Sequence, residues 1–359
     1  MNIPTGPDGK AIVLSAPSDL LAALPYLLGF HPVLSLVAMS IGHTGSVTSV
    51  IRYDLPDSAE GVDQIAANCR SVLTRERVPA AVLIGYGSGG RVTPAMDAVR
   101  EALRETDIKI VEALRCDGGR YWSYTCSDLG CCPVEGTPYD VTTHQVAVEA
   151  VAKGVVALPN RDALIASLAP VSGADREEMR QATALARARA HGLLRTQKDT
   201  YWFTEGLRHI EVCFSHVEAN RELPADDVAW LGVLLTGIQI RDVAMTETAR
   251  RGYAVCRRLW TEVVRRVEPE YVPAPATNLA FIALGAGDGA FARVAVERAL
   301  AVDPEYRFAR LISFGLDVGI PPAQLAEVDW AAQAQVIAEL AAKQPLGARP
   351  ILPPHPTTT

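Results

Sequence analysis

The stretch "AAVLIGYGSGG", Ala80–Gly90, predicts how the first part of this chain folds. Its continuous apolar run, Ala80–Tyr86, is typical of a β-strand that is buried on both faces of a sheet. A glycine-rich turn follows, and Thr93 with Pro94 then predicts the start of a helix that runs to Arg104. A buried strand that leads into a helix is the repeating unit of an α/β domain.

Short β-rich runs alternate with helical runs on both sides of this stretch. Two pairs of runs predict β-hairpins, namely Ser35–Ile41 with Val47–Leu55 and Ile108–Cys116 with Arg120–Cys126. Amphipathic segments, Asp19–Leu24 after Ser18 and Ser58–Arg77, predict flanking helices. We therefore expect residues 1–140 to form an α/β domain that contains a mixed sheet with two β-hairpins.

After residue 140 the strand signals stop and helical periodicity continues to residue 342, which predicts an all-α second domain. Its longer helices include the predicted segments Ala225–Met245 and Thr248–Val267. Residues 274–318 are TPR-like, because the small side chains of Ala292, Ala295 and Ala299 permit close helix packing. The Pro- and Thr-rich tail, 343–359, is predicted to be disordered.

Composition limits the classes of protein to which this chain can belong. A length of 359 residues favours two domains, and a formal net charge of −7 argues against unspecific binding to nucleic acid or to anionic membranes. The start "MNIPTGPDGK" shows no secretory signal, and apolar stretches such as Val228–Ile240 are too short to span a bilayer. We expect a cytosolic protein whose seven cysteines are thiols or ligands.

The turn Gly85–Gly90 has the pattern G-x-G-x-x-G, which in dinucleotide-binding domains lets backbone amides approach a pyrophosphate. Two features argue against that function: the predicted helix begins three residues after Gly90, and the next strand, Ile108–Leu114, ends without an acid. A small anionic ligand held at the helix start by Ser88, Arg91 and Thr93 is an alternative. A plain strand-to-helix loop is the simpler interpretation.

The segment "CSDLGCC" places Cys126, Cys131 and Cys132 in one loop. Zinc requires four ligands, so Cys116, across the second hairpin, or His144 would have to complete a site. A disulfide from Cys126 to Cys131 or Cys132, or a redox-sensing pair, is a second interpretation. The third, which we favour from the sequence, is that the three are structural thiols in a tight turn.

Single polar residues give weaker signals. His31, between a helix and a strand, and Arg120, just before the cysteines, are weak candidates for catalysis. Arg52 and Asp54 lie two apart on one predicted strand, where they could form an ion pair or contact a polar ligand. The sequence contains no nucleophile elbow, Walker A loop or H-E-x-x-H motif.

A stripe of arginines follows the predicted helix Thr248–Val267. It could meet an acidic partner or a phosphate backbone, but Glu262 and Glu268 interrupt it and most charged faces are simply solvated. Binding to nucleic acid is therefore not favoured. The six residues are Arg250, Arg251, Arg257, Arg258, Arg265 and Arg266.

Several stretches together resemble the actinobacterial family DUF4192, a domain of unknown function. They are "DLLAALPYLLGFHPVLSLV", "VIRYDLP", "VLIGYG" with "VTPAMDAVREAL", "GRYWSYTCSDLGCCPVEGTPYD" and "GDGAFARVAVERALAVDPEYRFARLISFGLDVGIPP". They span nearly the whole chain, and the cysteine block is the most specific of them. The resemblance implies a shared fold and no particular reaction.

Two hypotheses about function follow. The first, which we favour from the sequence, is a non-enzymatic ligand- or partner-binding regulatory protein with a helical interaction domain. The alternative is a thiol-dependent redox or metal-binding enzyme that uses Cys126, Cys131 and Cys132, with zinc as the cofactor that the thiols would suit.

Overall fold

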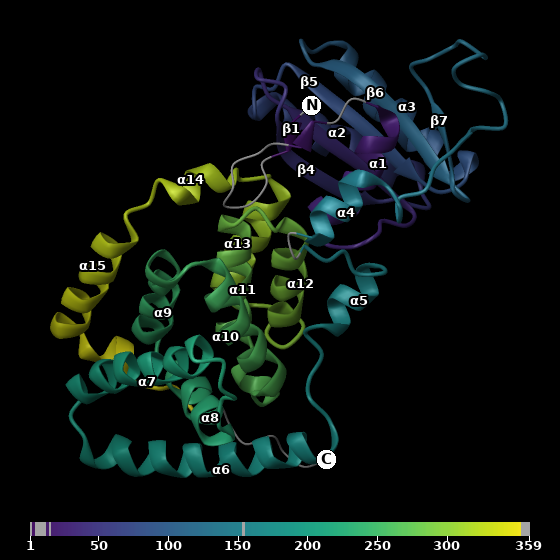
Figure 1. Cartoon of the computed structure of the whole chain (residues 1–359). Helices are drawn as coiled ribbons and strands as arrows, with labels where there is room; N and C mark the ends of the chain where they lie inside the picture. The colour runs from purple at the N-terminus through teal and green to yellow at the C-terminus, as the bar shows by residue number, and fades with distance from the viewer. Residues whose placement is uncertain (1, 4–11, 14–15, 153–154, 353–359) are drawn as a thin grey trace. The chain divides into compact units, whose positions relative to one another are not determined.

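The structure is a computed structural model that describes residues 2–3, 12–13, 16–152 and 155–352 (Figure 1). The chain forms two compact units. The α/β unit comprises Met1–Leu164 with Val318–Pro321, and the helical unit comprises Ile165–Asp317 with Pro322–Thr359. The units divide at residue 164, later than the boundary at 140 expected from the sequence, because helix α4 (Gln145–Ala152) packs against α1 (Pro17–Leu28).

A mixed six-stranded sheet is the centre of the α/β unit. Its strand order is β4-β3-β5-β6-β7-β8, and of these neighbours only β5 and β6 are parallel. Both predicted hairpins are present, as the pairs β3–β4 and β6–β7. The strands are β3 (Ser35–Ile41), β4 (Val47–Asp54), β5 (Ala80–Tyr86), β6 (Lys109–Asp117), β7 (Arg120–Ser123) and β8 (Thr137–Pro138); β1 (Asn2–Ile3) and β2 (Ile12–Val13) pair separately.

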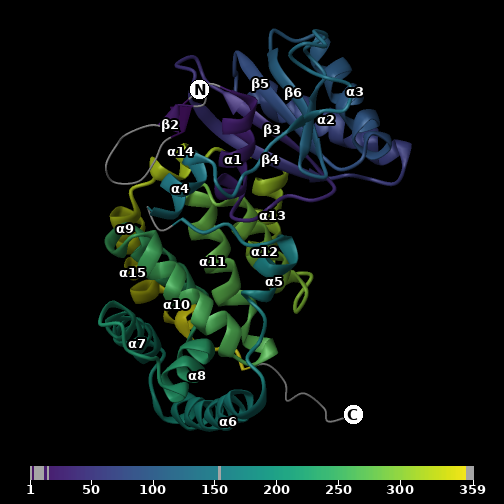
Figure 2. The same ribbon diagram turned by 45° about the vertical axis from the view of Figure 1, so that its right-hand side comes forward.

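Both faces of the central strands are covered. Leu36 and Ala38 of β3 lie in an apolar core with α2 (Ala59–Arg75) and α3 (Gly89–Arg104), while the alternate residue Val37 is equally buried on the other face. Figures 1 and 2 show α1 on that other face of the sheet. The continuous apolar run at β5 is therefore explained by burial on both sides.

Helix α3 begins at Gly89, so the start at Thr93 expected from the sequence is wrong. A Cβ on Gly85 would lie 2.1 Å from Cγ1 of Val92. Because Gly85 has no side chain, the first turn of the helix can pack directly against this strand. Pro94 is consequently inside the helix. Helix α1 likewise continues to Leu28 through Pro25, beyond the predicted end at Leu24.

The helical unit contains the helices predicted after residue 160, but three of them are divided. The segment 225–245 forms α8 (Ala225–Leu234) and the start of α9 (Ile238–Arg251), the segment 248–267 is split between α9 and α10 (Tyr253–Arg266), and the helix predicted at 323–340 forms α14 (Pro322–Ala326) and α15 (Trp330–Lys343).

Residues 235–237 separate α8 from α9, and Gly237 allows the close approach of the C-terminal segment, because an added Cβ would lie 2.4 Å from the carbonyl oxygen of Ala348. Gly252, with φ of +78°, separates α9 from α10. The long predicted helices at 225–245 and 248–267 are therefore wrong in their boundaries.

The helices of this part of the chain are as follows: α5 (Arg161–Ala166), α6 (Gly173–Thr196), α7 (Thr200–Glu218), α8 (Ala225–Leu234), α9 (Ile238–Arg251), α10 (Tyr253–Arg266), α11 (Pro273–Gly285), α12 (Gly289–Leu300), α13 (Arg307–Asp317), α14 (Pro322–Ala326) and α15 (Trp330–Lys343). Two 3₁₀ turns, η1 (Pro269–Tyr271) and η2 (Pro345–Ala348), complete it.

The predicted disorder of the tail is wrong for its first part. Ala348 is fully buried, and Arg349 donates a hydrogen bond of 3.3 Å to the carboxylate of Asp199. Residues 353–359, the rest of the predicted disordered segment, lie outside the described residues.

Within the described residues, no single helix is both long and apolar enough to cross a membrane. One pair, Ala225–Leu234 with Ile238–Glu247, meets the requirements of length and composition together but is bent by 117°.

Candidate metal and thiol site

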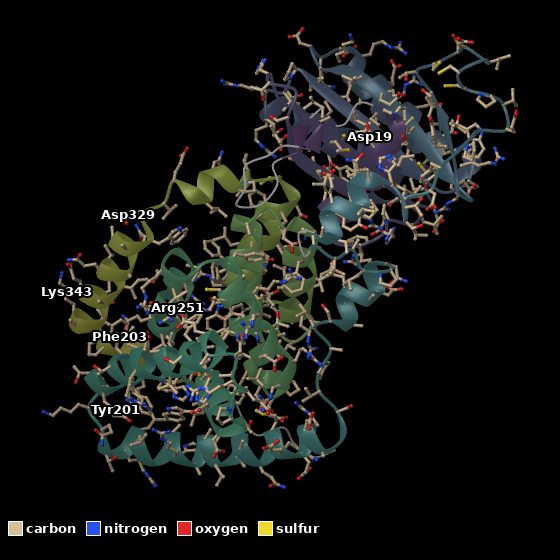
Figure 3. The ribbon with its side chains drawn as sticks, in the orientation of Figure 1. Asp19, Tyr201, Phe203, Arg251, Asp329 and Lys343 are labelled. Carbon is tan, nitrogen blue, oxygen red and sulfur yellow. The ribbon has the colours of Figure 1, made fainter. Side chains whose placement is uncertain are left out.

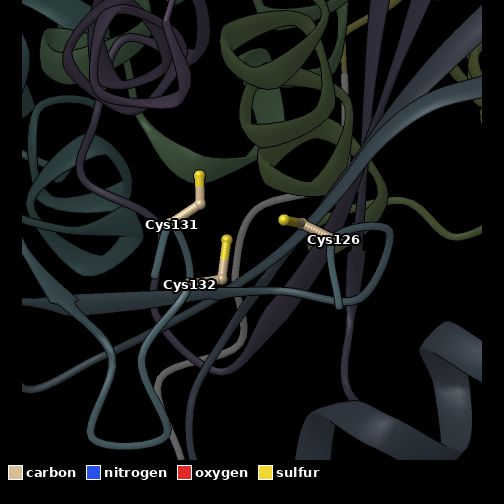
Figure 4. A group of neighbouring side chains, drawn as sticks. All are labelled: Cys126, Cys131 and Cys132. Atoms are coloured by element: carbon tan, nitrogen blue, oxygen red, sulfur yellow. The ribbon is translucent and has the colours of Figure 1, made fainter. Parts of the chain in front are cut away.

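The loop between β7 and β8 brings three cysteines together (Figure 4). The Sγ atoms of Cys126, Cys131 and Cys132 all lie within 4.8 Å of one another. Cys131 is exposed and the other two are half-buried. Among the described residues, these three thiols are the one group of His, Cys, Asp or Glu side chains whose spacing would suit a metal ion.

A helical turn within the loop orients two of the thiols. The backbone N–H groups of Cys131 and Cys132 both donate to the carbonyl oxygen of Asp128, at 3.1 and 2.7 Å. The Asp128 carboxylate in turn accepts from the N–H of Gly130 at 2.8 Å. This local hydrogen bonding closes the chain on itself and returns Cys131 and Cys132 toward Cys126.

The first end of the loop is held by Glu112 of β6. Its Oε1 accepts hydrogen bonds from the hydroxyls of Ser123, at 2.8 Å, and Thr125, at 2.5 Å. The Ser123 hydroxyl oxygen also accepts from the backbone N–H of Cys126 at 3.1 Å. Cys126 is thereby fixed relative to the sheet by Glu112, a residue for which the sequence predicts no role.

The second end of the loop is held by β7. The indole Nε1 of Trp122 donates to the carbonyl oxygen of Val134 at 2.9 Å, and Nη1 of Arg120 donates to that of Gly136 at 2.7 Å. Gly136 has a φ of +80°, and a Cβ there would lie 2.5 Å from Cε2 of Trp122. Arg120, a weak catalytic candidate in the sequence, thus binds loop backbone.

The thiols interact with one another. Hydrogen bonding to Cys126, followed by burial and hydrogen bonding to Cys131, raises the pKa of the Cys132 thiol to about 12. Cys132 is therefore the central thiol of the group. A metal ion that binds to the Cys132 thiolate must therefore displace the proton of this thiol.

The two proposed fourth ligands lie elsewhere. Cys116 is paired with Tyr121 across the β6–β7 hairpin, so the expectation that it lies opposite Cys126 is wrong. Burial raises the pKa of the Cys116 thiol to about 12, although its hydrogen bond with Tyr139 lowers it. His144 places Nε2 3.2 Å from the carboxylate of Asp19. Neither residue joins the three loop cysteines.

The spacing of the sulfur atoms suits a single small ion. Zn–S bonds of about 2.3 Å in a tetrahedron place the sulfurs about 3.8 Å apart. The three Sγ atoms, within 4.8 Å of one another, need to contract by only a small amount to reach that geometry. Three thiolates then fill three of the four positions of a tetrahedral ion.

The glycine-rich turn has more of the dinucleotide fingerprint than the sequence analysis allowed. Because α3 begins at Gly89, Gly90 lies inside the helix, and β6 ends at an acid, Asp117. Both sequence arguments against a bound dinucleotide are therefore wrong. Asp117 nevertheless lies 3.6 Å from Arg115, whose guanidinium also packs on an aromatic ring.

The residues predicted to hold a small anion at this turn have protein partners. Arg91 forms an ion pair with Asp57 and donates to the carbonyl oxygen of Leu55 at 3.1 Å. The hydroxyls of Thr93 and Tyr124 are 2.7 Å apart. Ser88 is the N-cap residue of α3. These contacts show a structural role for Arg91 and Thr93.

Two of the remaining candidates, Arg52 and Asp54 of β4, lie on the face of the sheet opposite to α3, because Arg52 is the register partner of Val37. The predicted ion pair between Arg52 and Asp54 is present at 2.6 Å, and the Arg52 guanidinium also lies 5.6 Å from the ring centroid of Phe30. His31 donates its backbone N–H to the carbonyl oxygen of Leu158, and burial lowers its imidazole pKa.

The arginine stripe is divided between two helices. Arg250 and Arg251 end α9, and the other four belong to α10. Arg251 (Figure 3) is held by Glu211, Glu218 and Glu247. Arg266 is not part of an exposed basic face, because it is buried and donates a hydrogen bond of 2.6 Å to the carbonyl oxygen of Leu223.

Two more of the stripe's arginines, Arg257 and Arg258, line a groove of about 600 Å³ together with the acids Glu222 and Glu262. Arg257 also lies 3.6 Å from the carboxylate of Asp288. Arg265 lies in the last turn of α10 with its Nε buried. The six residues therefore do not form one continuous basic face.

A comparison with protein families decides the membership of this chain. The family model described as "Domain of unknown function (DUF4192)" matches residues 17–323. The chain belongs to the DUF4192 family. The resemblance stated from the sequence is thereby confirmed, and the matched region of this DUF4192 chain includes the whole cysteine loop. No curated protein and no solved structure matches it.

Proposed function

We propose that this protein binds a thiophilic divalent metal ion, with Zn²⁺ as the best fit, through the thiolates of Cys126, Cys131 and Cys132. The observation that supports this function is the convergence of three Sγ atoms within 4.8 Å in one anchored loop. The sequence does not identify the ligand of the α/β unit. We propose that this ligand is a metal ion.

The chemistry of the donors selects the class of ion. Thiolates are soft ligands that suit Zn²⁺ and Cu⁺, whereas Mg²⁺ and Ca²⁺ take oxygen ligands. Zn²⁺ accepts a tetrahedron of thiolates without a preference from its d-electrons. The three donor atoms that converge are all sulfur, so oxygen-preferring ions fit them poorly.

Three protein ligands leave one position of the ion open. Structural zinc sites are closed by four protein ligands, whereas sites that keep a water or exchange ligands use three. Cys131 is exposed, so the ion would meet solvent on that side. We therefore propose an exchangeable site in place of a purely structural one, in a reducing compartment such as the cytosol, where thiols persist.

Metal analysis of the full-length protein tests the proposal. After purification under reducing conditions and incubation with ZnSO₄ and desalting, we expect one Zn²⁺ per chain. Substitution with Co²⁺ should give intense thiolate charge-transfer bands and the visible spectrum of a tetrahedral ion. The triple variant C126S/C131S/C132S should lose both signals.

The matched control is Leu129→Ala, which changes an exposed residue of the same loop without removing a thiol. It should bind metal as the native chain does. Metal content below a tenth of an equivalent in the native protein, with three loop thiols free to react with a thiol reagent, would overturn the proposal.

For residues 274–318 we retain a TPR-like interaction domain as a proposal. Helices α11 and α12 are joined by residues 286–288, and the small side chains Ala292, Ala295 and Ala299 of α12 are all buried, which supports close packing. An experimental structure in which α11, α12 and α13 superpose on a tetratricopeptide unit would test it; a different crossing of these helices would refute it.

A further inference from the structure

We infer that oxidation of the loop joins Cys126 to Cys132 in a disulfide, releases the bound metal ion and leaves Cys131 as the free thiol. This inference rests on the metal site proposed above and adds a redox-controlled release step to it. It also selects one pair from the three that the loop could form.

The pair Cys131–Cys132 is excluded by its geometry. Adjacent Cα atoms are about 3.8 Å apart across a trans peptide bond. Disulfides without strain span about 4.4–6.8 Å between Cα atoms. The two residues also belong to a hydrogen-bonded turn on the carbonyl oxygen of Asp128, which joining them would distort.

The choice between the other two pairs depends on which thiol is turned toward Cys126. In a helical turn, successive side chains diverge by about 100° because 3.6 residues complete a turn. Their side chains therefore leave the backbone in different directions, although all three Sγ atoms lie within 4.8 Å of one another. In Figure 4 the sulfur of Cys132 lies between those of Cys126 and Cys131 and is turned toward Cys126, whereas Cys131 is the exposed member, so Cys132 is the partner of Cys126.

The anchors of the loop allow this bond to form with little change elsewhere. The backbone N–H of Cys126 donates a hydrogen bond to the Ser123 hydroxyl. At the other end of the loop, the carbonyl oxygen of Val134 accepts a hydrogen bond from the Trp122 indole. The ring that closes between residues 126 and 132 lies wholly between these anchors. The two sulfurs need only move from their present separation to about 2.05 Å.

The chemistry balances with a hydroperoxide such as H₂O₂ as the oxidant. Two Zn–S bonds break and one S–S bond forms, so the two sulfurs together lose two electrons. The O–O bond of H₂O₂ takes those electrons and two protons from solvent, and two water molecules result. The third Zn–S bond, to Cys131, then breaks, because one thiolate alone holds the ion weakly; the Cys131 sulfur takes a proton from solvent, and the Zn²⁺ ion leaves with its charge unchanged.

The experiment uses the zinc-loaded full-length chain. It is treated with increasing H₂O₂ while a chromophoric chelator reports free Zn²⁺, and differential alkylation with fragmentation mass spectrometry identifies the joined cysteines. We expect one Zn²⁺ released per Cys126–Cys132 disulfide, and reversal of both by a dithiol reductant. The variant Cys131→Ser should form the same disulfide.

Metal-free protein, treated in the same way, separates failure of this inference from failure of the metal site. A chain that takes up no zinc yet forms the Cys126–Cys132 disulfide would overturn the metal site and its release step, and would support the thiol pair. Zinc release with Cys131 in the disulfide, or release with sulfinic acids and no disulfide, would overturn the pairing. Retention of zinc after the disulfide forms would overturn the release.

Discussion

The guanidinium carbon of Arg115 lies 3.6 Å from the centroid of a Trp122 ring. The two residues are register partners on β6 and β7, so the contact forms across neighbouring strands of the sheet. The same indole donates to Val134 and excludes a side chain at Gly136. Trp122 therefore connects the sheet to the loop that carries the thiols.

Trp122→Ala should weaken metal binding, because the returning half of the loop loses its hydrogen bond and its packing surface. We expect a fall of about tenfold to a hundredfold in zinc affinity, as for other residues that orient metal ligands. Competition with a chelator of known affinity measures it. Trp122→Phe, which keeps an aromatic ring and loses only the donor, should show a smaller fall; equal affinity in all three proteins would contradict the anchoring role.

Gly136→Ala should destabilise the α/β unit through two effects. A Cβ would meet the Trp122 ring at 2.5 Å, and the φ of +80° adds about 1–2 kcal/mol for a residue with a side chain. Gly118→Ala is the matched control, since its φ of +54° carries the backbone effect but no atom lies within 4 Å. Urea unfolding should show a larger decrease in the free energy of unfolding for Gly136→Ala than for Gly118→Ala. Equal decreases would show that the contact with Trp122 has no effect.

Arg251→Ala should destabilise the helical unit more than Arg250→Ala, although both arginines contact Glu211 and Glu247. The Arg251 side chain is 5% exposed and that of Arg250 is 59% exposed. Because Glu211 and Glu218 are half exposed, removing Arg251 should cost more than the about 0–1 kcal/mol of an exposed pair and less than the about 3–5 kcal/mol of a fully buried one.

Tryptophan fluorescence during urea unfolding can measure the difference between these variants, because four of the five tryptophans lie in the helical unit. The prediction is contradicted if Arg250→Ala lowers the free energy of unfolding as much as Arg251→Ala does.

The helical unit should lose stability in mild acid because of His209. Burial lowers the pKa of this imidazole below 6.5, although the hydrogen bond to the carbonyl oxygen of Asp227 and the Asp227 charge raise it. The unfolded chain therefore binds a proton that the folded chain does not. The contribution of His209 is complete above about pH 6.5 and is lost as pH falls toward the folded-state pKa, by at most about 1.4 kcal/mol per pH unit.

Urea unfolding from pH 7.5 to 5, followed by the same fluorescence, checks this prediction. His209→Gln should flatten the pH dependence in that range, and His191→Gln, at an exposed position of α6, should leave it as in the native chain. A native pH dependence in His209→Gln would assign the acid sensitivity to other groups.

The mixed sheet and both hairpins could be predicted from the sequence, since the β5 run and the turns at residues 42–45 and 117–119 are local signals. The start of α3 could not, because it depends on the contact between Val92 of the helix and Gly85 of β5. The breaks at Gly237 and Gly252 were missed for a similar reason. A helical pattern continues through both, and only tertiary contacts or a positive φ end the helices there.

For the candidate site, the sequence shows that three cysteines lie in one loop. It does not show that their sulfur atoms converge. Two signals were present but unused. A two-residue turn at Gly118 and Gly119 already places Cys116 opposite Tyr121, and the glycine of "PVEGTP" marks a place where a bulky neighbour excludes a side chain. The role of Glu112 needed the register of β6 and β7, which no local pattern supplies.

The close approach of Val92 to Gly85 has a consequence for the history of the family. Position 85 can take no side chain as long as position 92 carries the branched side chain of valine. The two positions are therefore not free to vary separately. A descendant that acquired alanine at position 85 would need a smaller residue at position 92, or a helix moved away from the sheet. Aligned sequences of the family should therefore show these two positions changing together.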